Sequence, residues 1–177
     1  MIKLYYTSKK GENEVQTRPD LSLGGYKSST LIPNNSVNNL FSDISVYSVV
    51  KGQSEFIGIM AKNESSNPVI NLRFWFDFPV GCQRKIEVAA VDLTEDGQIE
   101  GIENPYQQPY YAEFHEADGE GSAVDLGGIG AGQSIGIWLK SSINKENIVD
   151  EFSVNKIISG GNPQKSDEDV NLVFEWD

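Results

Sequence analysis

Apolar and polar residues alternate along much of this sequence, and no other feature restricts the possible folds as strongly. The clearest example is VINLRFWFDF, residues 69–78. Because successive side chains of a β-strand point to opposite faces, this alternation predicts a strand with one buried face. The buried face would carry Ile70, Leu72, Phe74, Phe76 and Phe78, and the opposite face would carry Asn71, Arg73, Trp75 and Asp77.

Similar alternation recurs between short segments rich in Gly, Pro and Asn. Further strands are predicted at residues 85–91, 135–139 and 170–176, with weaker candidates at 2–6, 45–50, 55–63, 110–116 and 152–158. No segment shows a convincing amphipathic helix, and only residues 38–44 and 143–152 suit a short helical turn. Many short strands separated by turn residues predict an all-β chain folded as an antiparallel β-sandwich.

The first part of the sequence differs from the rest. After Tyr6 it is rich in Ser, Asn, Gly and Lys, and its apolar residues are isolated. We do not expect such a segment to build core; it either wraps its own domain or docks on a neighbour. We therefore predict an N-terminal strand and extended arm over residues 1–43, followed by a sandwich domain over residues 44–177.

Composition restricts the environment and the partners. The 177 residues contain one cysteine, Cys82, which excludes an internal disulfide framework and a cysteine-rich zinc site. Residues 1–14 lack the apolar segment of a signal peptide, and no apolar run approaches the roughly 20 residues that span a bilayer. We thus expect a chain made in a cytoplasm with no membrane partner. The formal net charge of −12 disfavours nucleic acid, and no specific nucleic-acid partner is expected.

The octamer GGIGAGQS, residues 127–134, lies one residue away from the phosphate-binding pattern G-x-x-x-x-G-K-[ST]. Gln133 replaces the lysine whose charge a phosphate site needs. The following residues place Ile135, Ile137 and Leu139 on one face, which predicts a strand where a phosphate loop would open a helix. We interpret the octamer as a glycine turn that leads into an antiparallel strand, and we expect Gly132 to need either a positive φ or a close approach of another backbone segment.

No combination of residues indicates catalysis, and we predict no enzyme, no cofactor and no resident metal. The only histidine, His115, lacks a cysteine cluster with which to bind zinc, and we expect it on an exposed strand beside Glu116. Acidic clusters at residues 92–100, 116–125 and 165–171 are typical of solvated turns. Calcium binding at such a turn and a carboxylate pair for glycoside hydrolysis are the open alternatives.

Aromatic residues supply the candidate contact sites. Alternation places Trp75 and Trp138 on faces opposite the core, where they would suit an interface or a sugar-stacking platform. The alternative is an inverted alternation in one strand, which would put its tryptophan in the core. Residues 104–114, NPYQQPYYAEF, add three tyrosines beside two prolines, a pattern that favours a rigid contact loop. The candidate interface residues are Tyr26, Trp75, Tyr106, Tyr110, Tyr111 and Trp138.

Residues 126–143, LGGIGAGQSIGIWLKSSI, fit the pattern L-G-x-[IL]-x-[AP]-G-x-S-x-x-[IL]-W-[LIV]-[KR]-x-x-[IV]. The matching positions are Leu126, Gly127, Ile129, Ala131, Gly132, Ser134, Ile137, Trp138, Leu139, Lys140 and Ile143. This phrase resembles the end of a sandwich domain in tailed-bacteriophage virion proteins. Residues 22–45 and 56–79 are similar to the same proteins, so the resemblance covers most of the chain from 22 to 143. It departs at Ser142, near which those proteins often carry a second arginine.

The resemblance implies a non-enzymatic structural component of the phage tail, neck or baseplate region, with an immunoglobulin-like sandwich. Its partners would be other virion proteins and copies of itself, joined through the sandwich faces and the N-terminal arm. Its location would be the virion, after synthesis in the host cytoplasm. The alternative function is a carbohydrate or host-surface binding module that uses Trp75, Trp138 and the tyrosines.

Overall fold

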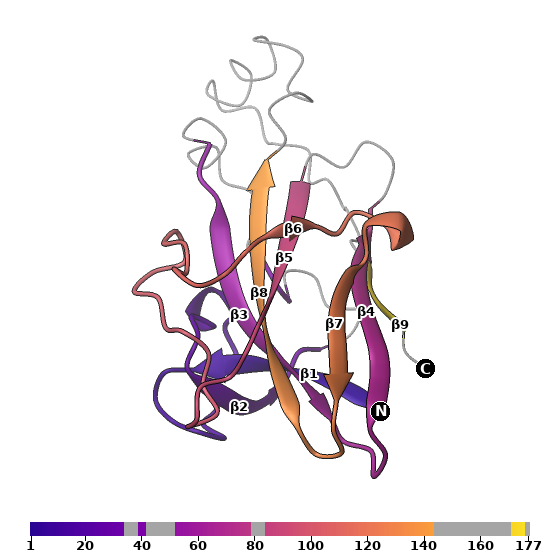
Figure 1. The fold of residues 1–177 in the computed structure, drawn as a ribbon. Coiled ribbons are helices and arrows are strands. Elements are labelled where there is room, and N and C mark those ends of the chain that lie inside the picture. Colours follow the sequence, from indigo (N-terminus) through magenta and orange to yellow (C-terminus); the bar gives the residue numbers. More distant parts are fainter. Residues whose placement is uncertain (34–38, 42–51, 79–83, 144–170, 176–177) are drawn as a thin grey trace.

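The computed structural model describes residues 1–33, 39–41, 52–78, 84–143 and 171–175, and for the last range only the backbone. Within these residues the chain is all-β, with two sheets in which every strand pair is antiparallel (Figure 1). The larger sheet has the order β2-β1-β3-β8-β5-β6, and the smaller has the order β7-β4-β9. The strands are β1 Ile2–Ser8, β2 Tyr26–Leu31, β3 Glu55–Asn63, β4 Val69–Asp77, β5 Arg84–Val91, β6 His115–Glu116, β7 Val124–Ile129, β8 Ser134–Ile143 and β9 Asn171–Glu175.

Most of the predicted strands that fall within the described residues are confirmed. β3, β4, β5, β8 and β9 lie where alternation predicts them, and β1 extends the predicted strand by two residues. The predicted strand at 110–116 is wrong except for its last two residues, because the preceding residues form a loop. Alternation does not predict β2 and β7, since YKSSTL is mostly polar and two adjacent glycines interrupt VDLGGI. The predicted strands at 45–50 and 152–158 and the residue Cys82 lie outside the described residues.

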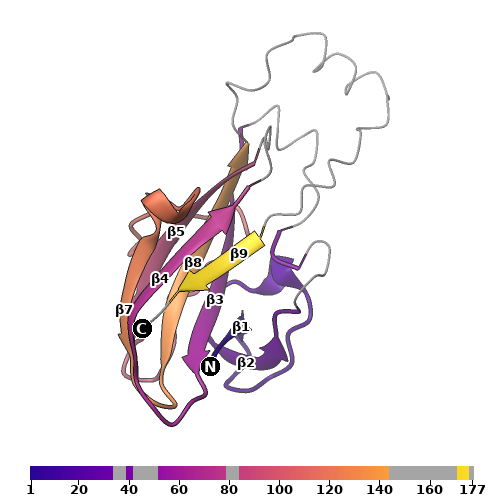
Figure 2. The ribbon, with the colours of Figure 1, turned by 90° about the vertical axis from the view of Figure 1, so that its right-hand side faces the viewer.

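The two sheets share an apolar core. Figure 2 views the smaller sheet from its own side, with β4 and β9 in front of strands of the larger sheet. Alternate residues of both sheets meet here, which removes the apolar face of each sheet from water. The larger sheet contributes Ile57, Ile59, Val88, Ile137 and Leu139, and the smaller contributes Leu72, Phe74, Phe76, Leu126 and Ile129.

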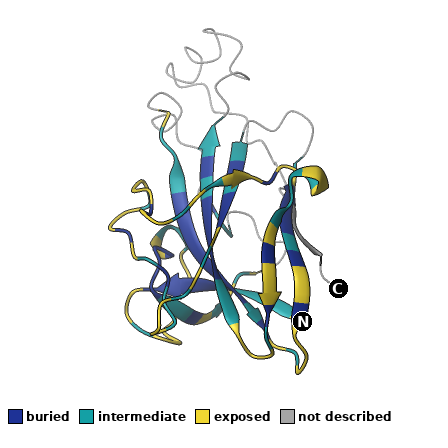
Figure 3. Ribbon diagram, in the orientation of Figure 1, coloured by how far each residue is buried: buried dark blue, intermediate teal, exposed yellow. Residues whose placement is uncertain are grey.

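A second apolar cluster covers the other face of the larger sheet. It consists of Leu23, Phe56, Met60, Ala89, Ile99, Ile102 and Trp138. Two segments form the cover, residues 22–25 and 99–102, and backbone hydrogen bonds join them: Gly25 and Ile99 exchange bonds of 3.1 and 3.0 Å. β3 and β8 are therefore buried on both faces, as their dark blue centres in Figure 3 show.

The N-terminal segment is part of this domain, and the expectation that it builds no core is wrong for its described residues. β1 lies between β2 and β3 in the larger sheet. Thr7 and Ser22 are fully buried, and their hydroxyls donate to Gly58 O at 2.9 and 2.6 Å. The Gly58 N–H donates back to Ser22 O at 2.8 Å. Because buried hydroxyls bonded to the backbone supply much of this packing, and Leu23 is an isolated apolar residue in the sequence, hydrophobic alternation gives no sign of it.

Tyr5 of β1 is buried, and its side chain contacts both β2 and the turn after β3. Its hydroxyl donates to the carboxylate of Glu64, which pairs with Lys3 at 2.5 Å. The Lys27 ammonium of β2 lies 4.3 Å from the centroid of the Tyr5 ring. Burial, and then the hydrogen bond and negative charge of Glu64, raise the pKa of Tyr5 to about 12. The phenol therefore stays protonated and donating across the neutral range.

The start of β4 departs from strict alternation. Ile70 is 54 % exposed and Val69 is buried, so the prediction that Ile70 faces the core is wrong. Val69 and Leu72 are three residues apart, yet their partners on β7 are two apart. The extra residue makes a β-bulge, and Asn71 takes a φ of 52°, a left-handed conformation that asparagine tolerates. The bulge shifts the alternation and brings Val69 inward in place of Ile70.

The octamer at residues 127–134 forms the arch between the two sheets, because β7 belongs to the smaller sheet and β8 to the larger. Gln133 N donates to Gly130 O at 3.1 Å, which closes a four-residue turn. Gly132, at the third position, has a φ of 73°. A positive φ at this position is the mark of a type II turn. The predicted glycine turn, the antiparallel strand after it and the positive φ of Gly132 are all confirmed.

Asn63, fully buried at the end of β3, holds this arch in place. Its Nδ2 donates to Asn67 O at 2.7 Å and to Ile129 O at 3.1 Å. Its Oδ1 accepts from Ser65 N at 3.0 Å and from Ser65 Oγ at 2.7 Å. Its backbone N–H donates to Gln133 O at 2.9 Å. One side chain thus uses all four of its hydrogen-bonding positions to connect the larger sheet with the turns at this end.

We expect Asn63→Ala to lower the free energy of unfolding by about 2–4 kcal/mol, because the Ile129 carbonyl loses its side-chain donor and the Ser65 N–H loses its side-chain acceptor. Ser65→Ala is the milder comparison, since it removes one hydroxyl and leaves both Nδ2 bonds, and about 1 kcal/mol is expected. Urea unfolding of the two variants measures the difference. Equal losses would contradict a central role for Asn63.

Because both faces of β8 are covered, we expect a larger side chain at Gly136 to destabilise the protein. An added Cβ at Gly136 would lie 2.2 Å from Ile99 Cγ2 and 3.1 Å from Val91 O. Gly136→Ala should therefore force the 99–102 cover away from the sheet and cost about 1–3 kcal/mol of stability. Gly121→Ala is the control, because nothing lies within 4 Å of its added Cβ. If both variants unfolded at the thermal midpoint of the wild type, the close approach of Ile99 to Gly136 would be contradicted.

Candidate functional site

Residues 103–111, called the tyrosine loop from here on, project at the left of the larger sheet in Figure 1. The chain reaches the loop from the 99–102 cover, where Ile102 is fully buried and its N–H donates to Leu23 O at 3.0 Å. Inside the loop, the Phe56 N–H of β3 donates to Pro105 O at 2.6 Å. These bonds fix the loop to the edge of the core.

A single carboxylate orders the far side of the loop. Glu100 accepts from Tyr110 N at 2.8 Å through Oε1 and from Tyr111 N at 3.0 Å through Oε2. Near the start of the loop, Asn104 Oδ1 accepts from Tyr106 N at 3.0 Å. Hydrogen bonds to an ionised carboxylate are among the stronger ones in proteins. Backbone hydrogen bonds thereby hold the loop and leave much of each tyrosine ring open to solvent.

The three tyrosine rings of the loop face solvent. Tyr106 is 50 % exposed, Tyr110 is 83 % exposed and Tyr111 is 81 % exposed. Tyr110 and Tyr111 meet edge to face, with centroids 4.9 Å apart and an interplanar angle of 85°. Large aromatic rings exposed on an ordered backbone favour binding, because little conformational freedom is left to lose. The structure thus brings three of the six predicted interface residues onto one loop.

The two tryptophans are not exposed, so the prediction that they lie on open outer faces is wrong. Trp138 has no exposed surface, because the 22–25 and 99–102 segments cover its face of β8. Trp75 shares a face with Arg73 and Asp77 as predicted, and its Nε1 donates to Asp77 Oδ1 at 3.3 Å. It is nevertheless only 7 % exposed.

Tyr26, the remaining predicted interface residue, is half-buried at the start of β2. It lies on the strand that pairs with β1, and it is not part of the tyrosine loop. Sequence reasoning missed Glu100, whose acidic neighbours suggested a solvated turn. It also missed the signal that Trp138 is covered: Gly58, its partner on β3, and Gly136 leave room on that face, and glycine inside a strand often marks a close approach.

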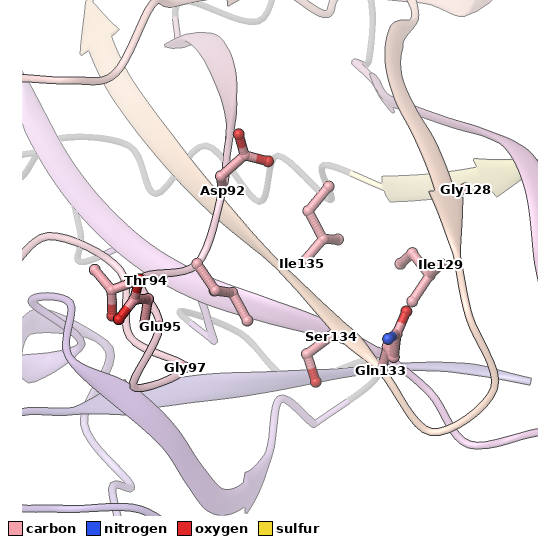
Figure 4. Close-up of a pocket in the computed structure, with 10 residues that line it drawn as sticks. Asp92, Thr94, Glu95, Gly97, Gly128, Ile129, Gln133, Ser134 and Ile135 are labelled. Atoms are coloured by element: carbon pink, nitrogen blue, oxygen red, sulfur yellow. The ribbon is translucent and has the colours of Figure 1, made fainter.

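An open groove of about 390 Å³ lies beside the arch (Figure 4). Its wall combines apolar side chains with polar ones from the turn after β5 and from the arch itself. The lining residues are Asp92, Leu93, Thr94, Glu95, Gly97, Gly128, Ile129, Gln133, Ser134 and Ile135. Two carboxylates and no cation line a groove next to the octamer, which is the wrong charge for a phosphate. The groove therefore agrees with interpreting the octamer as a turn.

The described residues contain no group of three or more His, Cys, Asp or Glu side chains placed to hold a metal ion. His115 is exposed on β6 beside Glu116, as predicted. The described ranges include the short 3-10 helices η1 Pro19–Leu21 and η2 Glu120–Ser122, and no helix in these ranges has the length and apolar character needed to cross a membrane. No family model, curated protein or solved structure matches this chain.

The role of Glu100 is testable apart from any partner. Glu100→Ala should speed amide hydrogen exchange at Tyr110 and Tyr111 by about tenfold, because each loses a charge-assisted bond worth roughly 1.5–3 kcal/mol in full. Glu103→Ala is the matched control, since that exposed carboxylate accepts no hydrogen bond within the described residues. Exchange that responds equally to both substitutions would contradict the assigned role of Glu100.

Proposed function

We propose that this protein is a non-enzymatic structural component of a tailed-bacteriophage particle, in the tail, neck or baseplate region. The observation that carries the proposal is the tyrosine loop, an ordered segment with three exposed rings attached to the edge of a β-rich domain. The resemblance of residues 126–143 to virion sandwich domains supports the same conclusion. The domain would be an immunoglobulin-like sandwich in this proposal, which agrees with its antiparallel sheets.

In this role the protein acts by burying surface against its neighbours, which are other virion proteins and copies of itself. It needs no cofactor, resident metal, membrane or specific nucleic acid. Exposed tyrosines suit such contacts, because each ring buries a large apolar area and its hydroxyl still hydrogen-bonds at the rim. The sequence predicts an N-terminal arm that docks on a neighbour. In the structure β1 and β2 instead join the larger sheet of their own domain, and Ser22 donates to Gly58 O within it.

A carbohydrate or host-surface binding module is the second candidate function. Exposed aromatic rings also bind sugars, and the same three tyrosines would form that site. The tryptophans contribute little to this alternative, because both are buried. Binding of the full chain to a glycan array, lost on substitution of the tyrosines, would favour the alternative.

The test of the main proposal is the presence of the chain in purified phage particles from the source that encodes it. Mass spectrometry of such particles should detect it at a fixed ratio to the other virion proteins, and a particle reconstruction should place it at the tail, neck or baseplate. Its absence from intact particles would overturn the proposal.

The loop makes a sharper prediction. A variant with Tyr106→Ser, Tyr110→Ser and Tyr111→Ser should keep its circular dichroism and thermal midpoint, because these rings are exposed, yet enter particles at less than about a tenth of the wild-type level. Val15→Ser is the matched control, since Val15 is an exposed apolar residue at 69 % and lies outside the loop. Normal incorporation of the triple variant would exclude the loop as the assembly surface.

A further inference from the structure

The sequence on either side of the tyrosine loop carries charge of one sign, while Lys9 of the N-terminal segment lies beside the loop entry, with its Cε 3.5 Å from a Cβ built on Gly101. Residues 86–139 contain eleven acidic residues and no lysine or arginine, and all of them are described. The acidic residues are Glu87, Asp92, Glu95, Asp96, Glu100, Glu103, Glu113, Glu116, Asp118, Glu120 and Asp125. Exposed carboxylates attract cations and repel anions over about a Debye length, which is roughly 8 Å at physiological salt.

Lysines of the chain itself neutralise only part of this negative charge. Glu87 pairs with Lys140 at 2.6 Å, and Glu116 pairs with Lys85, the two basic residues that bound the acidic segment. Glu103 and Glu113, which flank the tyrosines in sequence, are exposed and form no ion pair with any residue that the structure describes. Glu103 precedes Tyr106 by three residues and Glu113 follows Tyr111 by two, so the sequence places two unpaired carboxylates beside the segment that carries the exposed rings.

Lys140 is an example, within this protein, of a cation held by a carboxylate and an aromatic ring. Its ammonium pairs with Glu87 and lies 5.8 Å from the ring centroid of Phe114, just beyond the loop. A carboxylate and an aromatic face thus act on one cation, and each strengthens its binding. The exposed loop has the same types of residue along its sequence, with tyrosines corresponding to Phe114 and the flanking glutamates corresponding to Glu87.

The geometry of the rings favours a cation over a sugar. Tyr110 and Tyr111 stand almost perpendicular, at 85°, so they present one face and one edge instead of a flat platform. A lysine or arginine side chain needs a single ring face together with a nearby carboxylate. A sugar ring stacks over a broad apolar surface, which perpendicular rings do not provide.

We infer that the tyrosine loop binds a lysine- or arginine-bearing segment of a partner protein, whose cations lie on the tyrosine faces and pair with Glu103 and Glu113. The inference rests on the proposed function of the loop as an assembly surface, and it states the chemistry of the neighbour. Negative charge at the site would speed encounter with such a partner, and the ordered backbone would limit the entropy lost on docking.

The test uses the full chain and a fluorescent peptide of alternating arginine and glycine, with a serine and glycine peptide for comparison. Fluorescence anisotropy should detect binding of the arginine peptide to the protein and no binding of the serine peptide. The Tyr106, Tyr110 and Tyr111 triple-serine variant should weaken this binding by about tenfold without a change in net charge. Glu103→Gln with Glu113→Gln should weaken it by about threefold or more, and Glu120→Gln with Asp118→Asn, which removes the same charge elsewhere, should have a smaller effect.

Three results would overturn the inference: no binding of the arginine peptide, equal binding by the triple-serine variant, or a loss that follows net charge alone. Tyrosine-dependent binding to a neutral glycan without peptide binding would also do so. Particle incorporation separates the two proposals. A chain that enters particles through its tyrosines but ignores the peptide retains the proposed function and loses this inference. A chain that binds the peptide as expected but is absent from particles loses only the proposed function.

Discussion

Burial of β3 and β8 on both faces is the constraint on which the rest of the structure depends. Trp138 lies on the second face over Gly58, and Ile99 lies over Gly136, where no Cβ fits. The buried Nε1 of Trp138 has no hydrogen-bond partner among the described residues, a cost of roughly 1–3 kcal/mol that burial of its large ring offsets. The 22–25 and 99–102 segments exist in their observed paths because they cover this ring.

Buried polar side chains fix the backbone at the arch and at the N-terminal segment. Asn63 connects the larger sheet to the arch, and Thr7 and Ser22 connect the N-terminal segment to β3. Each of these side chains is fully buried and hydrogen-bonded, so each restricts the backbone to one arrangement. Apolar contacts, which tolerate small shifts, would leave the arch and the cover less well defined.

The tyrosine loop derives its properties from this framework. Its entry segment is part of the cover over Trp138, and Glu100 and Phe56 hold its backbone. Packing of the core therefore determines where the exposed rings lie, while the acidic sequence around them determines which partners they suit. An ordered, aromatic and negatively charged loop is well suited to contact basic protein surfaces, and this link joins the fold to the proposed assembly role.

The sequence by itself determined the all-β class, most of the strands, the glycine turn before β8 and the exposed tyrosines, because these depend on local alternation and turn chemistry. Only the tertiary structure decided which faces are covered. It buried Trp138, drew the N-terminal segment into the larger sheet and exchanged Ile70 for Val69 at a bulge. Alternation shows that a strand has two faces, but what covers each face depends on residues distant in sequence, whose contacts no local pattern contains.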